Sequence, residues 1–302
     1  MADSTIESFA IDYMRAPRKE PRTLRKVLDH LRQHVWTYLI LAVLTALFAA
    51  PFYWLIVCSL SNQSQIFSIP PHLFPLPPVW TNFHDAFTKI PLTRAFVNST
   101  VIAVMHVSLA LLLCSLAGYA FAKFPDAPGN RWMFAIVLAT MMIPGAVTMI
   151  PVFVILARLH MVNTYWAMIL PGAANAFGIF WMRQYIASNV PDDLLSAARI
   201  DGCSEWGVYW QIILPVIRPA LGALGILLLI GTWNNLLWAF IVLRTEDMYT
   251  LPLLIYLLKG ETETPWGMLM AAGLLATLPL IVAFLFFQRS FIAGITAGAV
   301  KS

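Results

Sequence analysis

Charged residues are scarce in this chain. Asp, Glu, Lys and Arg make up 11% of its 302 residues, whereas soluble domains average roughly 25%. Hydrophobic residues make up 60%, and the mean hydropathy is +0.75. A soluble fold of this length cannot cover so much apolar surface, so the composition excludes an ordinary soluble domain. It indicates a chain whose natural solvent is lipid.

The residue patterns of catalytic and metal sites are also lacking. The three cysteines, Cys58, Cys114 and Cys203, form neither a disulfide framework nor a metal-spaced pair, so reduced structural thiols are expected. No H-E-x-x-H occurs, and no G-x-x-x-x-G-K-[ST] loop that could hold ATP phosphates. We therefore expect no catalytic residue, metal or cofactor in this chain. Its net charge of +4 does not suggest nucleic-acid binding.

Long apolar runs are what the sequence does contain. A helix needs roughly 20 apolar residues to cross a bilayer core of about 30 Å. Six segments meet that requirement, approximately 36–60, 96–122, 132–157, 164–187, 216–243 and 267–288. We predict an all-α, polytopic membrane protein with six transmembrane helices. Prolines within the segments predict either ordinary kinks or hinge points; they are Pro51, Pro144, Pro151, Pro171 and Pro279.

Basic residues predict the orientation of these segments. If the amino end is cytoplasmic, 14 of the 19 Lys and Arg residues lie on the cytoplasmic side, as the positive-inside rule favours. Both termini and the connection 189–215 are then cytoplasmic. Residues 1–35 are basic, and we do not expect them to form a cleavable signal. They predict either an amphipathic helix on the anionic membrane surface or a solvated tail that only sets the topology.

The connection 189–215 has the pattern of a helix, a turn and a second helix. Pro191 suits a helix start, Gly202 suits a helix end, and Ser204 can cap the next helix. The second helix is rich in aromatic residues and runs to Pro215. Such a knob fits a groove in another protein. The alternative is an interfacial or re-entrant loop without a partner.

The same connection resembles the cytoplasmic coupling loop of ABC-importer permeases. That loop reads Glu-Ala-Ala, three residues, Gly, nine residues, Ile, one residue, Leu-Pro. Six positions match this spacing, and Ser196 replaces the leading Glu; the matching residues are Ala197, Ala198, Gly202, Ile212, Leu214 and Pro215. The resemblance implies that this loop, including Ser196 and Asp201 of the turn, docks on an ATPase made as a separate chain.

Other segments resemble the MalG-type sugar permeases. They are 162–166, 169–171, 232–237, 249–252 and the tail 293–302. The resemblance implies a type I importer permease (MetI-like) fold, with residues 36–302 as the permease domain and 289–302 as a cytoplasmic tail. It implies that Gly298, Val300 and Lys301 of the tail contact the ATPase.

The resemblance also implies the partners and the cargo. The partners are a second, MalF-like permease, two ATPase subunits that bind ATP and Mg²⁺, an extracytoplasmic substrate-binding protein and the surrounding lipids. The cargo is a sugar or related polyol. The location is the cytoplasmic membrane of a bacterium or archaeon.

Four side chains within the apolar segments are candidates for a substrate pathway: Asn175, Trp233, Asn234 and Asn235. Amides pair with sugar hydroxyls, and an indole can stack on a sugar ring. The alternative is that the Asn side chains join helices by hydrogen bonds. If Asn234 and Asn235 share a helix, they point about 100° apart, so only one faces the pathway. His106 is expected to pack between helices.

Two other functions predict features that this sequence does not show. An ion-coupled secondary transporter predicts carboxylates within its spans and inverted repeats, yet the six segments contain no Asp or Glu. An integral membrane enzyme predicts convergent His, Asp or Glu residues near one interface, and no such cluster is seen. The secondary transporter remains the alternative to an ATP-driven importer.

Overall fold

The computed structural model describes residues 34–259 and 264–299, with side chains up to residue 288. Within these ranges the chain forms helices and turns but no strand, which confirms the all-α prediction. The chain divides into two compact units, residues 1–54 and 55–302. Residues 1–33 of the predicted amphipathic segment 1–35 lie outside the described residues.

The described part of the first unit is a single apolar helix. Helix α3 (Val35–Ser59) is 25 residues long, with Pro51 inside it, and its last five residues belong to the second unit. It is long and apolar enough to span a membrane. This helix corresponds to the first of the six segments expected from the sequence.

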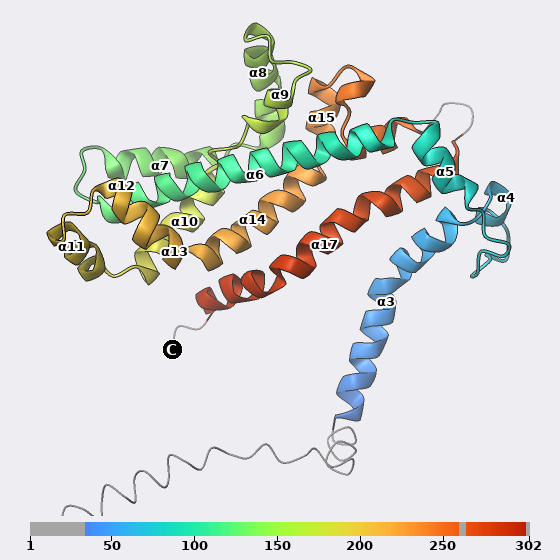
Figure 1. Ribbon diagram of the computed structural model, residues 1–302, viewed down its shortest axis with the longest axis horizontal. Helices are drawn as coiled ribbons and strands as arrows, with labels where there is room; N and C mark the ends of the chain where they lie inside the picture. Colours follow the sequence, from blue (N-terminus) through green and yellow to red (C-terminus); the bar gives the residue numbers. More distant parts are fainter. Residues whose placement is uncertain (1–33, 260–263, 300–302) are drawn as a thin grey trace, which may run out of the picture. The chain divides into compact units, whose positions relative to one another are not determined.

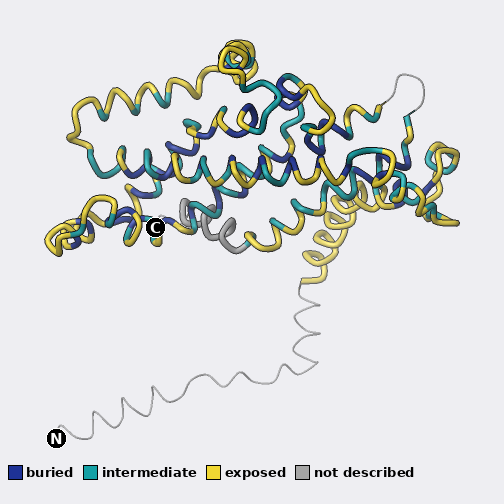
Figure 2. Tube along the Cα trace, turned by 45° about the horizontal axis from the view of Figure 1, so that its top comes forward, coloured by how far each residue is buried: buried dark blue, intermediate teal, exposed yellow. Residues whose placement is uncertain are grey.

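The second unit is built around one long helix, α6 (Leu92–Lys123) (Figure 1). Helices α10 (Ala176–Asn189) and α14 (Arg218–Trp233) pack along it, and α17 (Trp266–Ala299) packs on α14. Gly118 allows the close approach of α6 and α10, because a Cβ there would lie 2.6 Å from Met182 Cβ. Buried residues gather where these helices meet, as Figure 2 shows.

Three of the six apolar segments are continuous helices of spanning length: α3, α6 and residues 266–288 of α17. Two helix pairs reach that length only if each bent pair counts as one span. They are α7 (Asn130–Thr140) with α8 (Gly145–Arg158), bent by 104°, and residues 205–216 with α14, bent by 76°. The described residues thus hold three to five spans by length and composition.

The interruptions lie at residues that end or start helices. Pro144 is the N-cap of α8. Because proline has no backbone N–H, it cannot donate the hydrogen bond that would continue the preceding helix. Helix α9 (Tyr165–Ile169) ends before Pro171 and Gly172, whose φ of +78° suits glycine. Helix α15 (Leu236–Val242) starts after the break at Asn234 and Asn235. Segments three to five are therefore broken rather than merely kinked, whereas Pro51, Pro151 and Pro279 lie inside helices.

The end of α6 near Leu92 holds a second set of short elements: α4 (Gln63–Ile66), α5 (Thr81–Thr88), η2 (Glu246–Met248) and α16 (Leu251–Leu257). Buried Asn98 donates to the carbonyl oxygens of Asp247 (2.8 Å) and Tyr249 (2.9 Å). Its own oxygen accepts a 2.7 Å hydrogen bond from the Tyr165 hydroxyl. One side chain therefore joins α6, α9 and the approach to α16.

Candidate functional site

The connection 189–215 forms the predicted helix, turn and second helix. Helix α11 (Asp192–Ile200) follows Pro191 and ends at Asp201. Gly202 has φ +81°, a backbone conformation that other residues rarely adopt. The Ser204 hydroxyl accepts a 3.2 Å bond from the N–H of Gly207 and caps α12 (Glu205–Val208). The turn and cap chemistry expected from the sequence is confirmed. We call residues 189–216 the insert.

The insert continues into a wide π-helical turn, η1 (Tyr209–Ile213), which the sequence did not indicate. A short helix, α13 (Leu214–Val216), then leads through a 76° bend into α14. Such π turns are rare and often mark functional sites. In this turn Tyr209 is buried and its hydroxyl lies 2.7 Å from Ser115 Oγ of α6, whereas Trp210 stays half exposed.

Besides the contact of Tyr209 with Ser115, two polar attachments hold the insert on the end of α6. The Tyr119 hydroxyl donates a 2.7 Å hydrogen bond to Glu205, and Arg199 Nε donates a 2.8 Å bond to the same carboxylate. Lys123 Nζ lies 2.5 Å from Asp192 Oδ1 and 2.6 Å from the carbonyl oxygen of Val190. Because α11 and α12 are both tied to α6, the insert is not a free loop.

The carboxylate of Glu205 is surrounded by hydrogen-bond donors that favour its charged form. Arg199 first, and Tyr119 second, lower the pKa of Glu205 below its usual value of 4.5, and Glu205 raises the pKa of Arg199. The Arg199 guanidinium also lies 5.7 Å from the centre of the Phe124 ring, within the range of a cation–π contact. Glu205 is therefore an anion near neutral pH and accepts both hydrogen bonds.

The residues expected to contact an ATPase fall into two groups. Ser196, Ala197, Asp201, Gly202 and Pro215 are exposed, and Ile212 and Leu214 are partly buried against the core. Ala198 is only 7% exposed and packs in the core. Its small side chain allows close packing, as the sequence indicates, and its part in ATPase coupling stays a prediction.

Ser196 stands where the coupling-loop pattern has Glu. Its hydroxyl donates a 3.0 Å hydrogen bond to the carbonyl oxygen of Asp192, one turn earlier in the same helix. No other described contact of this hydroxyl braces the insert. The polar bracing comes instead from Glu205, Arg199 and Tyr119, three residues that sequence reasoning did not single out.

Four large apolar side chains of the insert are exposed. The exposed fractions are 43% for Leu194, 86% for Ile200, 64% for Trp206 and 52% for Trp210. Exposed clusters of apolar side chains often mark interaction sites. We call these four residues the outer face of the insert.

The pathway candidates meet at the helix breaks. The lining of a cavity of about 250 Å³ includes polar residues of α6 and α14 and of the starts of α10 and α15: His106, Thr232, Asn175 and Asn235. The Asn175 side chain caps α10 through a 2.7 Å bond from Gly178 N–H, and the Asn235 side chain caps α15 through a 3.3 Å bond from Trp238 N–H. The structure thus brings Asn175 and Asn235 to one cavity, although each also has a local structural role.

The positions of Asn234 and Trp233 differ from those expected for residues that share one helix and face a pathway. Asn234 lies in a helix break with Asn235, and both line a second cavity of about 690 Å³. The expected 100° separation does not apply because these residues are not within one helix. Trp233 is 5% exposed, and its Nε1 donates a 3.1 Å bond to the carbonyl oxygen of Ala276. Its position is that of a helix-packing residue, and a role for it in the pathway stays a prediction.

The remaining sequence expectations concern His106, metals and the tail. His106 Nδ1 lies 2.8 Å from the carbonyl oxygen of Ile169, which confirms its packing role. No group of three or more His, Cys, Asp or Glu residues within the described ranges could hold a metal ion. Gly298 lies in α17, beyond the described side chains, and Val300 and Lys301 lie outside the described residues.

These features define the class of protein: a helical membrane protein with a structured polar insert between apolar spans. Residues 114–296 match the family model described as binding-protein-dependent transport system inner membrane component. The chain belongs to this family, whose members are permease subunits of ABC importers. The match includes the insert, the helix breaks and most of α17.

Two curated relatives and one solved structure are similar to this chain. An arabinooligosaccharides transport system permease protein, AraQ, of Halalkalibacterium halodurans is 42% identical over 73% of this chain and 78% of its own length. The lactose transport system permease protein LacG of Rhizobium radiobacter is 34% identical over 92% of this chain and 99% of its own length. A bacterial ABC transporter involved in the import of the polysaccharide alginate has a TM-score of 0.75 at 23% identity. That alignment covers 85% of this chain and 95% of that one. This structure supports the fold.

Proposed function

We propose that this chain forms half of the translocation pathway of an ATP-driven, binding-protein-dependent carbohydrate importer. Both termini and the insert face the cytoplasm in this proposal, in agreement with the distribution of Lys and Arg. The other half is a homologous, MalF-like permease. An extracytoplasmic binding protein delivers the substrate, and ATP and Mg²⁺ are bound by two ATPase subunits made as separate chains.

The observation that carries the proposal is the braced insert with its exposed outer face. Ile200, Trp206 and Trp210 are apolar and exposed, while Glu205 and Asp192 fasten the same insert to α6. A groove of the ATPase would take up the outer face. The bracing then matters mechanically, because movement of the ATPase would pass to α6 as well as to the spans on either side of the insert.

The carbohydrate cargo is supported by two independent features. The curated relatives are named for arabinooligosaccharides and lactose, and the similar solved structure for alginate. The cavities at the helix breaks present the amides of Asn175, Asn234 and Asn235, which can donate to and accept from hydroxyl groups. Sugars and related polyols carry many hydroxyl groups, so this lining suits them.

The test is transport by vesicles that contain the assembled complex, with ATP or an ion gradient as the only energy source. We expect sugar uptake with ATP inside and the binding protein outside, and none with proton or sodium gradients. Trp206→Ala should reduce recovery of the ATPase with the complex and reduce uptake. The matched control is Trp132→Ala, since Trp132 is 76% exposed on α7, outside the insert. Uptake driven by an ion gradient without ATPase subunits would refute the proposal in favour of a secondary transporter.

A further inference from the structure

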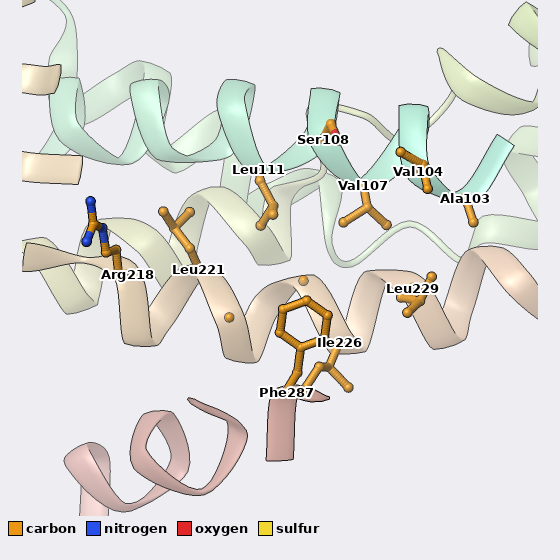
Figure 3. A pocket seen from close by; sticks show the side chains of 12 residues that line it. Ala103, Val104, Val107, Ser108, Leu111, Arg218, Leu221, Ile226, Leu229 and Phe287 are labelled. Carbon is orange, nitrogen blue, oxygen red and sulfur yellow. The ribbon is translucent and has the colours of Figure 1, made fainter. Parts of the chain in front are cut away.

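An apolar groove of about 440 Å³ lies in the second unit, between α6, α14 and α17. Figure 3 shows Val107 and Leu111 of α6 facing Leu221 and Leu229 of α14, with Phe287 of α17 below them. The groove is distinct from the helix-break cavities lined by Asn175 and Asn235, which involve other faces of these helices.

The groove has one cationic end. Arg218 lies where α14 begins, and the opposite end near Leu229 is apolar, as Figure 3 shows. Arg218 is exposed and takes part in none of the ion pairs found among the described residues. A single cation at the end of an apolar groove complements a molecule with an anionic head and a hydrocarbon chain.

The length of the groove suits a lipid acyl chain. Arg218 and Leu229 are eleven residues apart, or about 16 Å along a helix, which is close to the roughly 15 Å thickness of one hydrocarbon leaflet. An acyl chain that lies along α14 with its headgroup at Arg218 would therefore follow the apolar lining over the depth of one leaflet.

Glycines keep the floor of the groove open. A Cβ at Gly225 would lie 3.4 Å from Leu111 Cδ1, so a larger side chain there would project into the space between α14 and α6. Gly222 lines the groove as well, so two positions of α14 leave it open by having no side chain. Gly225 is a position at which the groove can be filled without altering Arg218.

We propose that the groove binds an anionic phospholipid, with the phosphate at Arg218 and one acyl chain between α6 and α14. The assignment to the cytoplasmic leaflet rests on the orientation given under the proposed function. Anionic lipids are concentrated in that leaflet. The groove itself and its charged end do not depend on ATP-driven transport.

The experiment uses the full chain, purified with its partner subunits, in phosphatidylcholine vesicles. The vesicles contain a trace of phosphatidylglycerol or phosphatidylcholine with a photoreactive group on the acyl chain, and labelled peptides are read by mass spectrometry. We expect phosphatidylglycerol to label residues 103–111 and 221–229 about fivefold more than phosphatidylcholine, the preference that one basic residue near the surface gives. Arg218→Gln should abolish this preference, and Arg218→Lys should retain it.

Two further variants separate groove filling from general disturbance. Gly225→Leu should reduce labelling by both lipids, whereas Gly145→Leu should not, because a Cβ at Gly145 meets nothing within 4 Å. Arg131→Gln serves as the charge control outside the groove. Equal labelling by the two lipids, or a preference unchanged in Arg218→Gln, would overturn the proposal. So would photo-crosslinking of residue 104 or 229 to the second permease instead of to lipid.

Discussion

The hydroxyl of Tyr119, near the end of α6, donates a 2.7 Å hydrogen bond to the carboxylate of Glu205, the first residue of α12. The two residues are 86 positions apart in the chain. Glu205 holds Arg199 at the same time, so one carboxylate joins α6, α11 and α12. The attachment makes the insert part of the helical core rather than an appendage of the neighbouring spans.

Removal of the Glu205 charge should uncouple the insert from α6. In Glu205→Gln the bonds from Tyr119 and Arg199 lose their charged acceptor, and such bonds contribute about 1.5–3 kcal/mol when shielded and less when exposed. We expect ATPase subunits to remain bound, while sugar taken up per ATP hydrolysed falls several-fold. The measurement is uptake and ATP hydrolysis on the same vesicles.

Glu246→Gln is the matched control for that variant, because Glu246 lies in η2 at the opposite end of α6. The ratio of uptake to hydrolysis should stay unchanged in this control. An unchanged ratio in Glu205→Gln would mean that the bond to α6 has no part in coupling.

The attachment should also depend on pH. Arg199 and Tyr119 lower the pKa of Glu205 below its ordinary value of 4.5, so its contribution is complete above that value. The contribution is lost as the pH falls through the depressed pKa. Spin labels at Asp126 and Ile200, both exposed, should therefore report a constant distance from pH 7 to about 5. The distance distribution should broaden below about pH 4.

Glu205→Gln supplies the reference for the pH experiment. Its label distribution should already be broad at pH 7 and should change less as the pH falls. A wild-type distribution that broadened between pH 7 and 6 would point to a different titrating group.

The contact of α6 with α10 should tolerate no side chain at Gly118. A Cβ there would lie 2.8 Å from the backbone nitrogen of Arg183, which cannot move without displacing α10. We expect Gly118→Ala to lower the thermal stability by the cost of overpacking, about 1–3 kcal/mol. Gly145→Ala, at an open position, should change the melting temperature little in the same detergent.

Asn163 should be difficult to replace. Its φ of +61° is in the left-handed region, which Asn adopts more readily than most residues. Its side-chain oxygen accepts from the N–H groups of Arg244 (2.8 Å) and Thr245 (3.2 Å). Asn163→Ala should lower the free energy of unfolding by about 1–3 kcal/mol. Asn163→Gly removes the backbone strain at this positive φ but does not restore the two hydrogen bonds. It should therefore recover part of the lost free energy of unfolding. Equal melting temperatures for all three proteins would contradict this account.

The sequence predicted the parts of the fold that depend on local chemistry. The apolar runs, the turn at Gly202 and the cap at Ser204 follow from residues close together in the chain. Proline and asparagine positions indicated irregular helices, but whether Pro144 and Pro171 cause a kink or a complete break depends on neighbouring helices. That information is not local.

The bracing of the insert could not be predicted for the same reason. Tyr119 lies within an apolar segment and Glu205 within a polar one. No local sequence pattern indicates that these two side chains form a hydrogen bond. Trp233 could not be assigned from the sequence because an indole in a span suits either a pathway or a helix interface. Only the acceptor at Ala276 identifies the interface.

The central claim is that the outer face of the insert docks on an ATP-hydrolysing partner. The most direct measurement places a photoreactive amino acid at Ile200, which is 86% exposed, in the assembled complex in cells. The account predicts a crosslink to the ATPase subunit, and none from the same group at Trp132 on α7. Crosslinks from position 200 only to lipid or to an extracytoplasmic protein would contradict it.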